Sequence, residues 1–219
     1  MTRILITLLI ILSISSLANA QFSKGSILLG GQISFSGYSS NNYYGDQNSH
    51  AGNFNISLGK AIQENTVIGI NLSYLPYTTS NYYSSYNPGP IAYSNNGYGI
   101  GVFYRKYKSL GKEFYIFGEA GAEYTGSTET GKNDSAIKVL TGSSSSGIIY
   151  LMPGIAYKIS KKFFLEITIP NLFAASFNNR TTTSQNTIPQ TSKSNQFAIS
   201  TSLSSNPLMS LGIGFRLNL

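Results

Sequence analysis

Cysteine and tryptophan are both absent from this sequence of 219 residues, and His50 is its only histidine. The absence of cysteine excludes disulfide bonds, and export without disulfides is compatible with a Gram-negative envelope, where a closed sheet supplies the stability. No spacing of His, Cys and carboxylates suits a metal ion, and no glycine-rich phosphate loop opens a helix, so we predict no metal and no cofactor. Asp46 and Ser49 lie near His50, but neighbouring loop residues do not establish the geometry of a nucleophile and its base, so we expect no enzyme.

A second absence is that of a long hydrophobic run. Beyond the N-terminus no stretch reaches about 18 apolar residues, which excludes spanning helices; spanning strands remain possible because their hydropathy is spread over alternate residues. At the N-terminus, Arg3 precedes the shorter apolar stretch 4–17, which ends in the small residues Ala18-Asn19-Ala20. This order predicts a signal peptide over residues 1–20, cleaved between Ala20 and Gln21, and one barrel domain over residues 21–219.

Charged residues make up only 11% of the chain, with 15 Lys and Arg against 8 Asp and Glu. A basic excess is one mark of nucleic-acid binding, but here six of the eleven lysines gather around two tight turns instead of lining one helix or an aromatic sheet. They are Lys106, Lys108, Lys112, Lys158, Lys161 and Lys162. We therefore expect no nucleic-acid partner and interpret these lysines as interfacial side chains beside anionic lipid headgroups.

The sequence is rich in one pattern, an alternation of apolar residues with polar or small ones. In the last segment Ile213 and Phe215 alternate with Gly214 and Arg216, and successive side chains of a strand point to opposite faces. Eight segments show the pattern: 26–36, 53–58, 68–74, 97–105, 114–124, 149–158, 163–169 and 209–219. Behind a secretion signal, this recurrence predicts an all-β fold, a single up-and-down antiparallel transmembrane β-barrel of eight strands that is apolar outside and polar inside.

The strand count depends on the segment before the last strand. Phe197 and Ile199 share the odd parity of residues 209–219. Residues 196–219 are therefore either one very long strand or two pieces separated by a turn or bulge over 204–207, and eight or ten strands remain open.

The expected connections alternate in length. Short turns are expected over 63–65, 109–111 and 160–161, and long loops over 39–50, 78–95, 126–146 and 178–195. Outer-membrane barrels have short periplasmic turns and long external loops, so both termini are expected in the periplasm. The long loops consist of Ser, Asn, Thr, Gly and Tyr, a composition that suits either solvated filler or contact with an unknown surface ligand. Without tryptophan, the external aromatic girdle is expected to consist of Tyr74, Tyr77, Tyr93 and Tyr98.

The inward faces carry seven charged residues: Arg105, Glu113, Glu119, Glu123, Lys158, Glu166 and Arg216. An eight-stranded barrel is just wide enough for its side chains, so we expect these charges to pair across the lumen as a polar plug; the alternative is a gate or narrow ion path. Glu166 and Arg216 both lie near the periplasmic rim of neighbouring strands, which predicts a pair. Glu119 and Glu113 are the alternative partners of Arg216.

Five segments resemble a known family: Phe103 to Arg105, Gly118 to Gly121, Pro153 to Tyr157, Lys162 to Glu166 and Ser210 to Arg216. Through them residues 21–219 resemble the small eight-stranded outer-membrane β-barrel proteins, particularly the porin-like type of Bacteroidota, with more distant similarity to the OmpX and OmpW types. The resemblance implies a monomer in the outer membrane of a Gram-negative bacterium, in contact with lipid and lipopolysaccharide and inserted by the barrel-assembly machinery. In one departure, the chain ends on Leu219 where such chains usually end on an aromatic residue.

The expected function is a structural or surface-interaction role without catalysis. One alternative is a narrow channel for small solutes or ions. A second is a soluble, lipocalin-like ligand-binding barrel, in which the faces are reversed and the apolar side chains fill the interior.

Overall fold

The computed structural model describes residues 22–42, 45–84, 87–133, 137–169, 171–185, 189–201 and 211–219. The expected signal peptide 1–20 and its cleavage site at Ala20 and Gln21 lie outside these residues. Within the described residues no helix has the length and apolar character needed to cross a membrane. The chain forms ten strands: β1 Ile27–Asn42, β2 Gly45–Gln63, β3 Thr66–Ser84, β4 Asn87–Gly111, β5 Phe114–Lys132, β6 Lys138–Lys158, β7 Phe163–Thr168, β8 Phe173–Ser184, β9 Gln190–Ser200 and β10 Gly212–Asn218.

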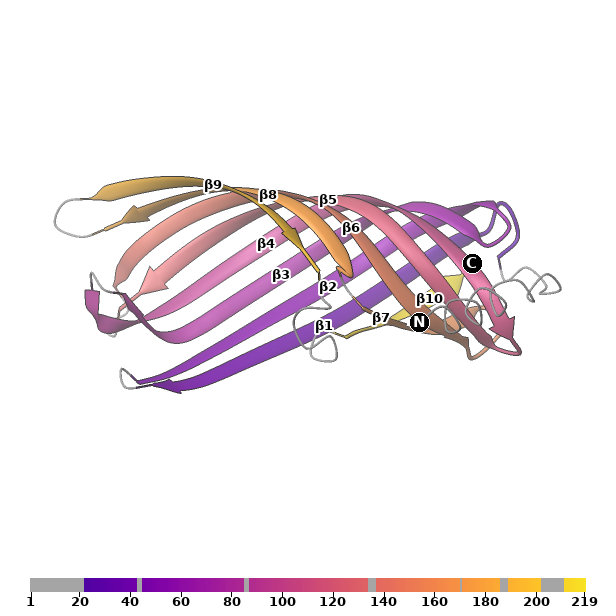
Figure 1. The fold of residues 1–219 in the computed structure, drawn as a ribbon, viewed down its shortest axis with the longest axis horizontal. Coiled ribbons are helices and arrows are strands. Elements are labelled where there is room, and N and C mark those ends of the chain that lie inside the picture. The colour runs from indigo at the N-terminus through magenta and orange to yellow at the C-terminus, as the bar shows by residue number, and fades with distance from the viewer. Residues whose placement is uncertain are drawn as a thin grey trace, which may run out of the picture.

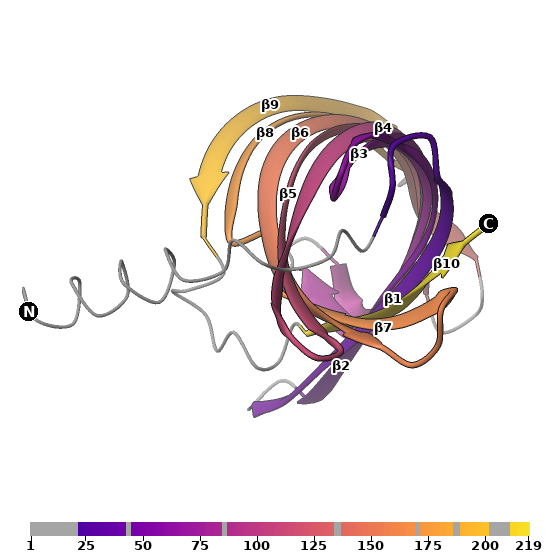
Figure 2. The same ribbon diagram turned by 90° about the vertical axis from the view of Figure 1, so that its right-hand side faces the viewer.

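Eight of the strands close into a ring. Strands β1 to β7 follow one another around the barrel, and β10 joins β7 to β1 through antiparallel ladders on both of its sides. Figure 2, which looks along the barrel, shows the sheet curving around the lumen. The predicted all-β, eight-stranded barrel is therefore confirmed.

The two further strands, β8 and β9, form a hairpin on the outer part of β6, above the short β7 (Figure 1). They arise because β7 stops at Thr168, before Pro170, which has no N–H to donate, and Asn171, which has a positive φ of 52°. The open question about 196–219 is answered as well. Strand β9 ends at Ser200 and pairs with β8, whereas β10 begins at Gly212 and pairs with β7 and β1. Residues 202–210, including the turn considered over 204–207, lie outside the described residues.

The two faces of the wall are reversed relative to a soluble protein. On the outer face Ile213 is 61% exposed and Ile100 57% exposed, whereas the inward Arg105 and Arg216 are each 3% exposed. An outer face of apolar side chains around a polar, charged interior is stable only when lipid is the surrounding solvent. The lipocalin-like alternative, which needs an apolar interior, is wrong.

Short turns connect strands at one end of the barrel, the end at which β10 also terminates (Figure 1). Two of them fall at the expected positions near 63–65 and 160–161, whereas residues 109–111 still belong to β4 and the turn there lies at 112–113. Left-handed conformations occur at Asn65, with φ 57°, at Gly111, with φ 102°, and at Lys112, with φ 50°. Glycine and asparagine tolerate this region best, and tight hairpins require it.

Most residues of the expected long external loops lie in strands, so these segments are paired extensions and not irregular loops. The ladders continue far past the apolar band, as in the pairs Gly37 with His50 and Tyr77 with Asn95. Above the lipid both faces of a strand meet water, so the apolar alternation disappears, while the backbone still forms the ladder hydrogen bonds and Thr and Tyr favour the extended conformation. Only 43–44, 85–86, 134–136 and 186–188 of these segments lie outside the described residues.

Candidate functional site in the barrel lumen

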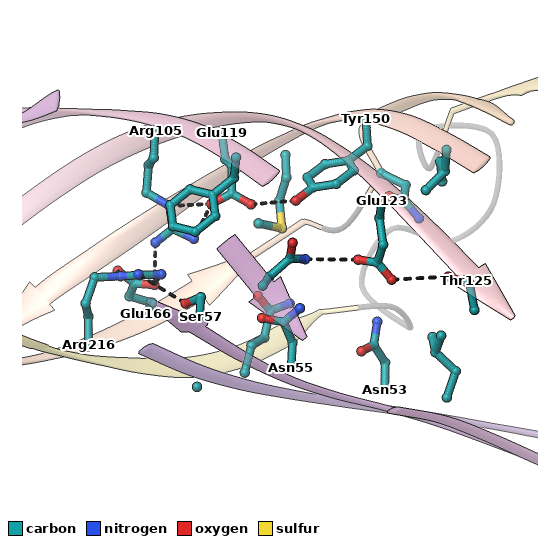
Figure 3. A pocket seen from close by; sticks show the side chains of 18 of the residues that line it. Asn53, Asn55, Ser57, Arg105, Glu119, Glu123, Thr125, Tyr150, Glu166 and Arg216 are labelled. Atoms are coloured by element: carbon teal, nitrogen blue, oxygen red, sulfur yellow. Dashed lines mark hydrogen bonds and ion pairs between the residues drawn. The ribbon is translucent and has the colours of Figure 1, made fainter. Parts of the chain in front are cut away.

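A network of four buried charges crosses the lumen, with one side chain each from β4, β5, β7 and β10 (Figure 3). Arg105 Nε and Nη2 both lie 2.6 Å from Glu119 Oε2, and Arg105 Nη1 lies 2.7 Å from Glu166 Oε2. On the other side of Glu166, Arg216 Nε donates to Oε1 at 3.0 Å and Nη2 donates to Oε2 at 3.2 Å. Glu166 therefore joins both arginines, as strand parity predicts for Arg216, and the two positive charges balance the two negative ones.

The strand register brings these residues together. Arg105 and Glu119 are direct partners of the β4–β5 ladder, and Glu166 faces Gly214, two positions before Arg216. A Cβ atom at Gly30, on the neighbouring β1, would collide with the guanidinium of Arg216. Gly30 thus provides the space in which Arg216 lies.

Aromatic side chains complete the hydrogen bonding of the network. The Tyr107 hydroxyl donates to Glu166 Oε1 at 2.9 Å, and the Tyr150 hydroxyl donates to Glu119 Oε1 at 3.0 Å. The Arg105 guanidinium also lies over the ring of Phe117, 4.3 Å from its centroid. A buried ion pair is stable only when its remaining polar atoms are bonded, so these contacts offset the cost of removing four charges from water.

An apolar cluster closes the lumen on the side of the network that faces the short turns. Phe22, which is fully buried, packs edge-on against Tyr107 at 4.9 Å and Phe164 at 5.1 Å between ring centroids. Its main-chain N–H donates to Asn65 Oδ1 at 3.2 Å, and its carbonyl accepts from the Asn65 N–H at 3.0 Å. The sequence analysis missed Phe22; its only signal was an isolated aromatic residue just after the expected cleavage site.

On the outer side of the network lies Glu123, whose carboxylate contacts neutral donors alone. It accepts hydrogen bonds from Asn71 Nδ2 at 2.9 Å, Ser73 Oγ at 2.5 Å and Thr125 Oγ1 at 3.3 Å.

Two further residues expected in the network, Glu113 and Lys158, lie outside it. Glu113 is exposed beside the β4–β5 turn, and its carbonyl accepts a hydrogen bond from the main-chain N–H of the half-buried Lys158 at 2.8 Å. Neither side chain forms an ion pair with a described residue.

The four tyrosines expected in the external girdle divide between the two faces. Tyr74 and Tyr98 lie on the outer face with their ring centroids 5.1 Å apart, in a row that continues through Phe54 to Phe35. Tyr77 and Tyr93 share the parity of the inward residues, because they are separated from Tyr74 and Tyr98 by three and five positions.

Tyr93 belongs instead to a polar cluster inside the barrel above the apolar band. Its hydroxyl accepts a hydrogen bond from Arg180 Nη2 at 3.1 Å, and Arg180 Nη2 lies 2.7 Å from Glu129 Oε2. Burial and the hydrogen bond to Glu129 raise the pKa of the Tyr93 hydroxyl to about 12.

Neither catalytic nor metal-binding geometry is found in the described residues. Ser49 and His50 are adjacent in β2, so their side chains point to opposite faces, and Ser49 Oγ donates to Thr79 Oγ1 at 2.9 Å. No group of three or more His, Cys, Asp and Glu in the described part of the chain is arranged to hold a metal ion.

Several solved structures are similar to this chain. Neisserial surface protein A is 14% identical, with 90% of this chain and 98% of that chain covered and a TM-score of 0.41. The translocator domain of the autotransporter NalP from Neisseria meningitidis is 8% identical, with 90% and 65% covered and a TM-score of 0.47. The attachment invasion locus protein Ail of Yersinia pestis is 12% identical, with 90% and 100% covered and a TM-score of 0.38.

A search of curated proteins finds no match. Residues 4–188, well over half of the chain, match the family model described as "Outer membrane protein beta-barrel domain". This match agrees with the outward apolar face and assigns the protein to the outer membrane; the Bacteroidota subtype stays a prediction. The chain belongs to the outer membrane protein beta-barrel domain family.

Proposed function

We propose that this protein is a sealed outer-membrane anchor that carries long β-hairpins above the membrane for surface contacts and performs no catalysis. The observation that carries the proposal is the length of the strands. A spanning strand needs about 9–11 residues, whereas β4 has 25 and β5 has 19. The excess lies at the end opposite the short turns (Figure 1).

The chemistry of the extensions supports contact with other molecules. On β4 the outward apolar residues run from Tyr98 to Tyr104, and residues 92–97 beyond them include Asn95, Asn96 and Ser94. Asparagine and serine adapt their hydrogen bonding to a partner, and tyrosine adds contact area at low entropic cost. The paired backbone holds these side chains on a rigid ribbon instead of a solvated loop.

The lumen supports the anchor over the channel alternative. The Arg105–Glu166–Arg216 arrangement crosses it, and the cluster around Phe22 lies below. A barrel of eight strands is narrow enough for its inward side chains to block a continuous channel. Planar-bilayer recordings are therefore expected to show no stable channel that passes sugars, and such channels would favour the transport function instead.

The surroundings follow from the fold. Outer-membrane lipid covers the apolar band, and we propose that the protein is a monomer inserted by the barrel-assembly machinery, since all eight ring strands come from one chain and close without a partner.

Surface presentation is tested by cysteine labelling, because the native chain contains no cysteine. Thr128 and Ala122 share the exposed outer face of β5, and Lys112 is exposed at the opposite end of the barrel. In intact cells, Thr128→Cys is expected to react with a membrane-impermeant maleimide, while Ala122→Cys is shielded by lipid and Lys112→Cys by the outer membrane. Labelling of Lys112→Cys with protection of Thr128→Cys would reverse the orientation and remove the proposed role.

A further inference from the structure

A cavity of about 290 Å³ lies in the lumen next to the charge network and extends to Glu123 and Thr125 on its outer side (Figure 3). Two arginines and three glutamates line it, and two of the glutamates, Glu119 and Glu166, are paired with the arginines. Glu123 is the third. The cavity therefore carries one surplus negative charge, which favours a positively charged ligand.

The Glu123 carboxylate is held in place without being neutralised. Its three donors, from Asn71, Ser73 and Thr125, are an amide and two hydroxyls, none of which carries charge. These hydrogen bonds fix its orientation. They leave its attraction for a cation intact.

The backbone of β4 is shaped around this group. A Cβ atom at Gly99 would collide with Glu123 Oε1 and with Ser73 Oγ, and one at Gly101 would collide with Asn71 Oδ1. Any larger residue at these two positions displaces the carboxylate or the amide that holds it. The arrangement of Glu123 thus depends on several strands and not on one exposed side chain.

Two amide oxygens of residues that line the cavity lack a hydrogen-bond donor. Asn53 Oδ1 and Asn71 Oδ1 are both buried without a partner among the described residues, and both side chains line the cavity. The Asn71 side chain is almost fully buried, at 4% exposed. Its orientation is fixed, because its nitrogen must face the carboxylate. The unsatisfied groups here are acceptors, so the complementary ligand carries several donors.

We propose that this cavity binds a small organic cation with one or more primary ammonium groups. An ammonium group supplies a positive charge for Glu123 and three donors for the polar side chains that line the cavity. The cavity volume corresponds to roughly ten water molecules, which fits a short aliphatic amine better than a bare metal ion. Since the cluster around Phe22 closes the periplasmic side, the ligand enters from outside the cell.

The test uses 1,4-diaminobutane as the probe, with 1,4-butanediol as the neutral molecule of matched length. Isothermal titration of the folded, detergent-solubilised full barrel is expected to show saturable binding of the diamine and none of the diol. Glu123→Gln keeps the hydrogen-bonding shape and removes the charge, so affinity is expected to fall by about tenfold or more. Glu113→Gln, which removes an exposed carboxylate at the periplasmic turn, is the matched control and is expected to bind normally.

Folding is checked by heat-modifiable migration on gels, and Asn53→Leu provides a second variant that leaves Glu123 untouched and is also expected to bind more weakly. Three results would overturn the proposal: equal binding of diamine and diol, unchanged affinity in folded Glu123→Gln, or binding of calcium chloride without any binding of diamine. The channel recordings and surface labelling described above do not depend on this site, so its failure and that of the anchor function are distinguishable.

Discussion

Arg216 and Glu166 are joined by two hydrogen bonds across the neighbouring strands β10 and β7, at 3.0 and 3.2 Å. Both side chains are almost fully buried, each 3% exposed. The same carboxylate also binds Arg105, so Glu166 is the residue on which both buried arginines depend. A charge left without its partner in such a site costs more than the pair contributes.

This dependence predicts a non-additive pair of mutations. Glu166→Gln is expected to destabilise the barrel by on the order of 3 kcal/mol because it leaves Arg216 without a carboxylate, and Arg216→Met by a somewhat smaller amount because Glu166 keeps Arg105. In the double mutant Arg105 and Glu119 still balance, so the loss is expected to be smaller than the sum.

The measurement is urea unfolding in lipid vesicles, arranged as a double-mutant cycle. Glu113→Gln, at an exposed position, serves as the control with an expected effect near zero. Strictly additive losses would show that Glu166 and Arg216 do not act as a pair.

The lipid-facing band predicts a depth-dependent cost for charge. Ile213→Arg, Ile70→Arg and Ile100→Arg each place a cation in the middle of the apolar band, where the cost is on the order of 2 to 4 kcal/mol. Thr128→Arg lies on an outer face above the band and is expected to cost little. Equal unfolding free energies for Ile100→Arg and Thr128→Arg in vesicles would place both residues in the same solvent.

The raised pKa of Tyr93 predicts a change in the alkaline range. An unfolded phenol titrates near 10 and the folded Tyr93 near about 12, so the folded state holds this proton more tightly. The contribution of this group to stability is present below pH 10 and is lost as the pH rises through about 12. The measurement is the difference in phenolate absorbance between the wild type and Tyr93→Phe as the pH is raised. This difference is expected to appear only as the pH approaches about 12. A difference midpoint near 10 would mean that Tyr93 is not buried beside Glu129.

The sequence predicted those parts of the fold that the lipid imposes. Because one face must be apolar and the other polar, the pattern identified the eight strands of the ring and the inward positions of Arg105, Glu119, Glu166 and Arg216. The same parity places Tyr77 and Tyr93 on the inner face, whereas composition alone suggests a place in the external girdle.

The rest of the fold could not be predicted, because no contrast between lipid on one face and water on the other marks it in the sequence. The external parts of β3 and β4 meet water on both faces, so they show no alternation. The β7–β8 interruption depends on Pro170 and Asn171, which read equally well as the end of a strand or as a turn. Phe22 lies in no strand, and its position depends on tertiary contacts with Asn65 and Phe164.

Phe22 itself provides the last prediction. Because its ring lies between Tyr107 and Phe164, Phe22→Ala opens space at the periplasmic mouth. Val67, fully buried in the same cluster, reports this opening when replaced by cysteine.

The measurement is the rate at which Val67→Cys reacts with a water-soluble thiol reagent. In the wild-type background the cysteine is expected to resist the reagent. In the Phe22→Ala background it is expected to react at least about tenfold faster, since a buried group reacts only when its surroundings open. The barrel itself is expected to remain folded because residues 22–26 precede β1 and belong to no ladder of the ring, and heat-modifiable migration on gels checks this. Ser23→Ala, one residue further along the same segment, is the control and is expected to leave Val67→Cys protected. Equal reaction rates with Phe22 and with Ala at this position would show that the segment does not close the lumen.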